Sequence, residues 1–308
     1  MVIAVTHIGY ENEPGYSDMD IARNSHDIDV IIGGHSHTVI DPNDNRSGVP
    51  KWRVPNADGD TISVLQTGSS GVNLGEIDIN LATKDVTARL IPVDKRLDDR
   101  VGSKIEEIVA PYRKQVEEMR SKKIGNSPYE YERKSPEMVN LLSDFVRTRG
   151  AELSGKPVDL SIMNKGGIRN SLAAGPITQG EIIDIAPFDN SIVVMEIKGK
   201  DLLDNIAIMA SQDGQGVSSN VEILYDPSTK AVNSATIDGK AIDHAKTYRL
   251  ATIDYLAAGN DYMEPLKRST ILAKSPEVLY QILIDYVAEG KLDKLLANPD
   301  KQQRMRSF

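Results

Sequence analysis

Two histidines one residue apart, His35 and His37, have the clearest chemical potential in this sequence. They follow the apolar run 30–32 and two glycines, and glycine lets the backbone turn sharply at a strand end and approach a ligand closely. A third histidine, His7, ends the apolar run 2–5. The chain has no cysteine, so any metal would be held by nitrogen and oxygen. We expect the three imidazoles to meet at one sheet edge as a metal site; the competing interpretation is an exposed histidine pair.

A second candidate motif is Asn-Lys-Gly-Gly-Ile-Arg at residues 164–169, after a predicted strand. Its two glycines let the main chain pass close to a ligand, and Arg169 offers a planar fork of donors that fits phosphate oxygens. On spacing alone, a turn with a surface arginine is the favoured interpretation of the motif. Arg133 or Lys134 is a further candidate for a phosphate contact.

Aromatic and acidic residues in two later loops complete the candidate set. Phe188 lies in the loop 186–190, Tyr255 ends a predicted strand, and Asp261 lies in the loop that follows. An aromatic pair can sandwich a nucleobase, and a carboxylate can accept hydrogen bonds from ribose hydroxyls. Core packing is the competing interpretation for Phe188, one of only three phenylalanines.

The elements that must position these residues follow from apolar periodicity and capping signals. Continuous β-branched runs at 2–5 and 30–32 predict buried, parallel-type strands, and apolar residues at helical spacing from 101 to 119 predict a long helix. Capping signals at 135–137, 178–181 and 275–277 predict the starts of three helices. The first of these helices is expected to end at Gly150. The other predicted strands are 61–65, 74–81, 86–93, 158–163, 191–197, 221–224, 235–237 and 249–254. The other predicted helices are 18–24 and 200–210. The C-terminal tail, residues 301–308, is expected to fray.

Length and charge bound the possible functions. A chain of 308 residues predicts two domains, or one domain and a large fragment of another. The formal net charge of -9 disfavours a nucleic acid polymer as partner but leaves a small anionic substrate possible. No segment approaches the roughly 20 apolar residues that span a bilayer, and no signal peptide is recognisable. The chain opens directly into an apolar strand, so we expect it to lack the N-terminal part of a larger protein.

Several stretches resemble one known family. Thr-His-Ile-Gly at 6–9 with Gly-Gly-His-Ser-His at 33–37 resembles the second half of a calcineurin-like metallophosphoesterase domain, and 74–78 and 90–94 resemble its end. The Asn-x-Gly-Gly-Ile-Arg, Pro-Phe and Tyr-Leu-Ala-x-Gly-x-Asp stretches within 158–263 resemble the C-terminal domain of the bacterial 5'-nucleotidase and UDP-sugar hydrolase family.

The resemblance implies roles for particular residues. His7 and His35 would bind one ion, and His37 the other, of a dinuclear site for divalent metals such as Zn or Mn. Asn164 and Arg169 would hold the substrate, with Arg169 on the phosphate side. Phe188 and Tyr255 would stack on the base, and Asp261 would bind ribose.

The resemblance also implies an α/β (α+β) fold in three parts. Residues 1–98 would form the C-terminal part of a metallophosphoesterase domain, a truncated β-sandwich with helices. Residues 99–126 would form a helical connector, and residues 127–308 a complete mixed α/β nucleotide-binding domain.

The sequence departs from the family in two places. The family's Asp-x-His pair, its bridging Asp and its catalytic Asn-His pair lie upstream of the Thr-His strand and are absent from this chain, so no catalytic residue is assigned. Where the family reads Asn-Gly-Gly-Asp-Gly, this chain reads Ala-Gly-Asn-Asp-Tyr at 258–262, which changes the loop that carries Asp261.

The expected function is metal-dependent hydrolysis of nucleoside 5'-monophosphates, by a fragment that needs a separate N-terminal half as partner. One alternative is a 2',3'-cyclic-nucleotide phosphodiesterase and 3'-nucleotidase; another is a non-catalytic module that binds a nucleotide or nucleoside. The resemblance implies a periplasmic or cell-surface location.

Overall fold

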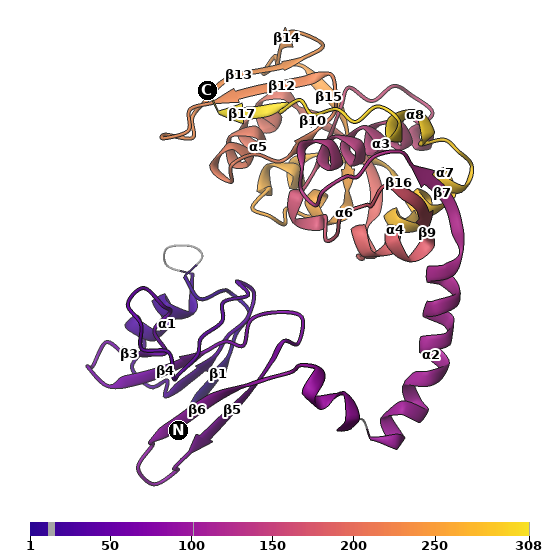
Figure 1. The fold of residues 1–308 in the computed structure, drawn as a ribbon. Coiled ribbons are helices and arrows are strands. Elements are labelled where there is room, and N and C mark those ends of the chain that lie inside the picture. The colour runs from indigo at the N-terminus through magenta and orange to yellow at the C-terminus, as the bar shows by residue number, and fades with distance from the viewer. Residues whose placement is uncertain (12–15, 101, 308) are drawn as a thin grey trace. The chain divides into compact units, whose positions relative to one another are not determined.

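A computed structural model of the chain describes residues 1–11, 16–100 and 102–307. The chain divides into two compact units, Met1–Ile108 and Val109–Phe308, which Figure 1 colours from indigo to purple and from magenta to yellow. The division falls inside helix α2 (Ser103–Ser121). Both units combine helices with sheets, which confirms the mixed α/β class. Among the described residues, no helix combines the length and apolar character needed to cross a membrane.

The first unit is built on a four-stranded sheet in the order β1-β2-β4-β3. The strands β1 (Ile3–Val5), β2 (Val30–Ile32) and β4 (Thr61–Leu65) run parallel, and β3 (Arg53–Pro55) pairs antiparallel with β4. Helix α1 (Asp18–Asn24) begins with a capping box of Ser17 and Asp20. It buries Met19 and Ala22 with Ile31, Ile62 and Val64 of the sheet. A separate hairpin pairs β5 (Asn73–Ile79) with β6 (Val86–Pro92).

The prediction that both early apolar runs are buried holds for β2 and is wrong for β1. Val30 and Ile31 are fully buried, whereas Val2 is 46% exposed and Val5 80% exposed. The reason is the position of β1 at the edge of the sheet, where only β2 flanks it.

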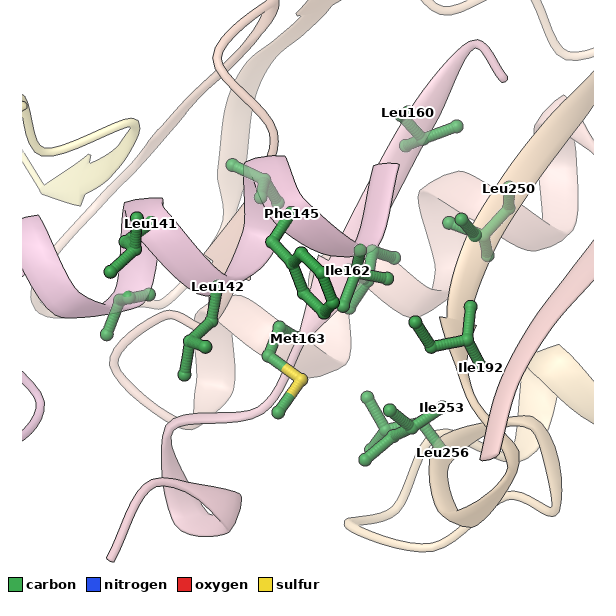
Figure 2. Packing of buried hydrophobic residues seen from close by; sticks show 14 of the residues in the cluster. Leu141, Leu142, Phe145, Leu160, Ile162, Met163, Ile192, Leu250, Ile253 and Leu256 are labelled. Carbon is green, nitrogen blue, oxygen red and sulfur yellow. The ribbon is translucent and has the colours of Figure 1, made fainter. Parts of the chain in front are cut away.

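The second unit has a five-stranded mixed sheet in the order β11-β8-β15-β10-β16. Its strands are β11 (Gly216–Val217), β8 (Leu160–Met163), β15 (Thr247–Ile253), β10 (Ser191–Lys198) and β16 (Thr270–Val278). Helix α3 (Pro136–Ser154) packs on this sheet, and Figure 2 shows Leu142 and Phe145 of the helix with Ile162 and Met163 of β8 in the buried core.

Smaller elements surround this core. The sheet β14-β13-β12-β17 and the pair β7-β9 complete the strands, and short helices connect them. The bounds are β7 (Lys123–Ser127), β9 (Gly175–Thr178), β12 (Val221–Tyr225), β13 (Val232–Ile237), β14 (Lys240–Ala241), β17 (Met305–Ser307), α4 (Gln179–Ile185), α5 (Gly199–Ser211), α6 (Asp254–Ala257), α7 (Leu279–Ala288) and α8 (Asp293–Leu296), with 3-10 turns at Lys95–Arg100, Lys165–Gly167 and Glu264–Arg268.

Two helix ends differ from those predicted. Helix α3 continues through Gly150 and ends at the left-handed Gly155 (φ 63°). Gly150 instead allows α3 to approach β15 closely, because a Cβ there would lie 2.6 Å from the Cβ of Ala251 on that strand. The long helix ends at Ser121, so residues 123–126 of the expected connector belong to β7, which pairs with β9.

Two further differences lie near the C-terminus. Residues 275–277, expected to begin a helix, lie within β16, and the helix starts only at Leu279. The tail expected to fray instead forms β17, which pairs in parallel with β12. In both places strand pairing with a distant segment prevails over a local signal.

Candidate functional site

The histidine loops lie at the carboxyl ends of the parallel strands in the first unit. His7 follows β1, His35 follows β2, and Gln66 follows β4 directly. Parallel strands end at one edge of a sheet, and this topology brings two of the histidines together. The ring centroids of His7 and His35 are 5.3 Å apart, with the rings at 74°.

The backbone of this loop is unusual for its residue types. His35 (φ 77°) and His37 (φ 58°) both adopt left-handed conformations, which cost energy for any residue with a Cβ. Gly34 allows the close approach, since a Cβ there would lie 2.9 Å from Nδ1 of His7. Strained backbone of this kind concentrates at functional sites.

Gln66 fixes the shape of the loop from beneath. It is 3% exposed, and its Nε2 donates to the carbonyl of Gly34 at 3.0 Å. Its Oε1 accepts from the backbone N–H of Thr38 at 2.6 Å and from the hydroxyl of Ser36 at 3.0 Å. One side chain thus holds both ends of the histidine loop, a role for which no motif in the sequence gives a signal.

Asp18 supports the same loops from helix α1. It is fully buried, and its Oδ1 accepts from the hydroxyl of Thr6, beside His7, at 2.6 Å. Its Oδ2 has no hydrogen-bond partner among the described residues and packs against Gly33, where a Cβ would lie 2.0 Å away. Burial raises the pKa of the Asp18 carboxyl, and the bond from Thr6 opposes that rise. Sequence reasoning missed this residue as well.

The histidines have the right chemistry for a metal but form an incomplete set. Imidazole nitrogens suit Zn and related ions, and His7 and His35 lie near each other. Within the described parts of the chain, however, no group of three or more His, Asp or Glu side chains is arranged to hold an ion. The predicted trio therefore is not assembled as a cluster, and His37 stays a predicted ligand.

In the second unit, sheet topology gathers the other candidates at one edge. Strands β8 and β15 are parallel neighbours, so the loop with Asn164 and the loop with Asp261 leave the sheet on the same side. Strand β10 is antiparallel to β15 with Ile192 opposite Ile253, so Phe188, just before β10, reaches the same edge.

Asp261 is the centre of this group. Its Oδ2 accepts from Nδ2 of Asn164 at 2.7 Å, and its Oδ1 accepts from the hydroxyl of Tyr255 at 2.9 Å. Asn164 is 4% exposed and Tyr255 is 39% exposed, so the carboxylate joins a buried amide to an accessible ring. Burial and the Asp261 carboxylate raise the pKa of Tyr255 to about 12.

Arg169 and Phe188 form the opposite part of the group. The Arg169 guanidinium carbon lies 5.0 Å from the centre of the Phe188 ring, within the range of a cation–π contact. Among the described residues Arg169 has no carboxylate partner, so its donors are available. Phe188 is 39% exposed, which contradicts the core-packing interpretation.

The altered loop at 258–262 is held in a strained form. Asp261 (φ 54°) and Tyr262 (φ 62°) are both left-handed, and Tyr262 occupies a position where glycine would carry no steric penalty. The side-chain amide of Gln212 donates to the Asp261 carbonyl at 2.9 Å and so fixes the loop. Gln212 is another supporting residue that spacing in the sequence could not indicate.

Comparison with known sequences agrees with this arrangement. Residues 116–268 match the family described as 5'-nucleotidase, C-terminal domain. The chain is 27% identical over 286 residues to the trifunctional nucleotide phosphoesterase YfkN of Bacillus subtilis, covering 84% of this chain and 18% of that protein. It is 27% identical over 301 residues to UshA of Yersinia enterocolitica, covering 85% of this chain and 54% of UshA. The chain thus spans about half the length of UshA and a smaller part of YfkN.

Solved structures show the same fold. The 5'-nucleotidase precursor of Thermus thermophilus superposes with a TM-score of 0.68 at 22% identity, covering 94% of this chain and 61% of that one. A putative 5'-nucleotidase of Staphylococcus aureus gives a TM-score of 0.63 at 18% identity, covering 96% and 59%. These structures show the fold, and the sequence match shows that residues 116–268 belong to the family described as 5'-nucleotidase, C-terminal domain.

Proposed function

We propose that this chain carries the substrate-binding part of a phosphoric monoester hydrolase that acts on nucleoside 5'-monophosphates. The observation that carries the proposal is the group at one edge of the second unit's sheet, in which Asp261 joins Asn164 to Tyr255 while Arg169 lies over Phe188. Two accessible rings, a carboxylate and a guanidinium without a carboxylate partner among the described residues match the base, ribose and phosphate of a nucleotide.

Each part of a nucleotide finds complementary chemistry in this group. A base can stack on Phe188 and Tyr255, which are equally exposed at 39%. The Asp261 oxygens each accept one hydrogen bond from the protein and have lone pairs left for ribose hydroxyls. The Arg169 fork can donate to the phosphate once a base takes its place over Phe188.

The proposed hydrolysis also needs divalent metal ions, and the first unit carries the histidines that could bind them. We propose that His7 and His35 hold one divalent ion and His37 a second, in a site that further ligands must complete. Such ions, when bound, supply an activated water and stabilise negative charge on phosphate oxygens. Three histidines leave open coordination positions, so we expect hydrolysis only when a separate polypeptide with the Asp-x-His and Asn-His pairs completes the site.

Substrate profiling tests the proposal. Phosphate release from AMP, 3'-AMP and 2',3'-cyclic AMP is measured with Mn²⁺ or Zn²⁺, for this chain alone and with such a polypeptide added. We expect negligible release by the chain alone and release from AMP after completion. Preferential turnover of the cyclic substrate would instead support the phosphodiesterase alternative.

The non-catalytic alternative makes a different prediction. If the chain only binds nucleosides, the completed protein releases no phosphate from any substrate. The affinity for a nucleoside is then the same in His35→Ala as in the parent chain. Robust hydrolysis by the chain alone would contradict the proposed need for further metal ligands. A periplasmic or cell-surface role in nucleotide catabolism accords with the family resemblance and is tested by cell fractionation.

A further inference from the structure

A polar cavity of about 300 Å³ lies in the second unit, apart from the proposed nucleotide group. Its walls come from the start of α3, the loops around Lys165 and Gln215, Tyr225 at the end of β12, and the C-terminal segment 302–307. None of Asn164, Arg169, Phe188, Tyr255 or Asp261 lines it.

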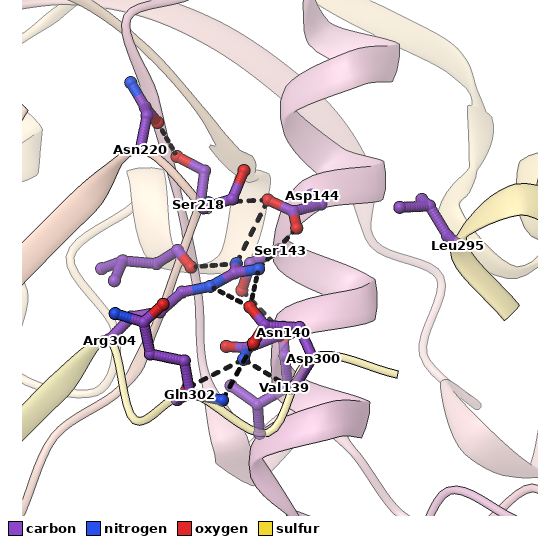
Figure 3. Close-up of polar contacts among 12 residues, drawn as sticks. Val139, Asn140, Ser143, Asp144, Ser218, Asn220, Leu295, Asp300, Gln302 and Arg304 are labelled. Atoms are coloured by element: carbon purple, nitrogen blue, oxygen red, sulfur yellow. Dashed lines mark hydrogen bonds and ion pairs between the residues drawn. The ribbon is translucent and has the colours of Figure 1, made fainter. Parts of the chain in front are cut away.

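Two of the cationic residues in the cavity wall are fully engaged within the protein. Arg304 is 4% exposed and pairs with Asp144 at 2.6 Å and Asp300 at 2.9 Å, as Figure 3 shows. Arg306 pairs with Glu222 at 2.7 Å. The charges of these two arginines are therefore already paired within the protein.

Lys134 and Lys165 differ, because neither has a carboxylate partner among the described residues. The one acidic residue in the described wall, Asp213, pairs with Lys230 at 2.5 Å, and the Lys165 ammonium reaches only the Asp213 carbonyl, at 3.4 Å. Burial and Lys134 lower the pKa of Lys165, which Asp213 opposes. Burial, with Arg133 and Arg169, lowers the pKa of Lys134. Both ammonium groups therefore lie where a negative charge would stabilise them.

The hydroxyl of a buried tyrosine points to the same conclusion. Tyr225 lines the cavity and is 5% exposed, yet its hydroxyl has no hydrogen-bond partner among the described residues. This oxygen is not among the fully buried atoms that lack a partner, so it is accessible from the cavity and can donate a hydrogen bond to a bound molecule.

We propose that this cavity is a second ligand site, which binds a small anion with two or more negative charges through Lys134, Lys165 and the hydroxyl of Tyr225. Phosphate-bearing and polycarboxylate molecules share this chemistry. None of the five residues proposed to hold a nucleotide lines this cavity, so the two proposals are tested by different variants.

Isothermal titration of the whole chain with sodium pyrophosphate, and separately with citrate, tests the proposal at constant ionic strength. We expect saturable binding of at least one anion, weakened about tenfold or more by Lys165→Gln and by Lys134→Gln, since each removes a charge-assisted hydrogen bond. Tighter binding of pyrophosphate would indicate a phosphate-bearing ligand, and tighter binding of citrate would indicate a polycarboxylate.

Two variants serve as controls. Lys267→Gln removes an exposed lysine that pairs with Glu264 outside the cavity and should leave anion binding unchanged. Arg169→Gln should weaken it less than about threefold, because Arg169 lies outside the cavity wall. The proposal is overturned if neither anion binds, if both lysine variants bind as the parent does, or if Arg169→Gln alone abolishes binding.

Discussion

At the scale of single residues, Asp261 holds the proposed nucleotide group together through its charge. Its carboxylate accepts a hydrogen bond from the Tyr255 hydroxyl, and burial together with this contact raises the pKa of Tyr255 to about 12. We predict that Asp261→Asn lowers the pKa of Tyr255 toward its ordinary value of about 10, because removal of the anion makes the phenolate less unfavourable. Carbon-13 NMR titration of labelled tyrosines measures this change.

A second tyrosine–aspartate pair supplies the control for that titration. The Tyr280 hydroxyl donates to Asp189 at 3.2 Å, and burial, together with this contact, raises the pKa of Tyr280. Asp189→Asn should lower the pKa of Tyr280 and leave that of Tyr255 in place. An unchanged Tyr255 in Asp261→Asn would show that burial alone sets its pKa.

His37 carries a conformational cost for its place in the metal-site loop, since its φ is 58°. We predict that His37→Gly stabilises the first unit by roughly 0.5–1 kcal/mol, because glycine adopts this conformation without a Cβ penalty. Trp52, the only tryptophan and a residue of this unit, reports its unfolding in urea. His26→Gly is the control: His26 does not have a left-handed backbone, so this substitution should lower the free energy of unfolding of the first unit.

At the scale of elements, the C-terminal segment is anchored by one buried side chain. Arg304 joins Asp144 of α3 to Asp300 and donates to the carbonyl of Val217 at 2.9 Å. We predict that Arg304→Ala lowers the free energy of unfolding of the second unit by about 1.5–3 kcal/mol, since it removes the donor to the Val217 carbonyl and to two carboxylates that are partly exposed. Urea unfolding followed by circular dichroism measures the loss.

Arg306→Ala is the matched control for this element. Its partner Glu222 is largely solvent-exposed, and exposed ion pairs contribute about 1 kcal/mol or less. Equal losses for the two variants would contradict the anchoring role of Arg304.

The elements also show how far local sequence signals reach. The capping box at 178–181 predicted the start of α4, and apolar patterning predicted α1, β2 and β4 close to their observed bounds, because these signals act within a few residues. They failed at Ser275-Pro276-Glu277, which resembles a helix start. The segment belongs to β16, an edge strand that pairs with β10 through a register shift, and proline is tolerated in such a place.

The candidate site residues also divide into those that local sequence signals indicate and those that only long-range contacts reveal. Histidines after apolar runs and glycine-arginine or aromatic loops are visible in the sequence, and the structure gathers most of them at two sheet edges. The residues that hold them, Asp18, Gln66 and Gln212, were not predictable. Each acts on a loop distant in sequence, so only the folded chain reveals its role.

At the scale of the whole molecule, the two units carry different parts of the proposed chemistry. The first offers imidazoles for metal, and the second offers rings, a carboxylate and a guanidinium for a nucleotide. With a net charge of -9 the chain as a whole repels a nucleotide, so recognition depends on local groups such as Arg169.

The most direct test of the central claim is isothermal titration of the whole chain with adenosine and with AMP. We predict that both bind, that Phe188→Ala weakens both by roughly 1–3 kcal/mol, the range for base stacking on an aromatic ring, and that Arg169→Gln removes the advantage of AMP over adenosine. Tyr112→Ala, which removes an exposed aromatic ring from α2, should change neither. Equal affinity of the parent chain and Phe188→Ala for adenosine would contradict the account.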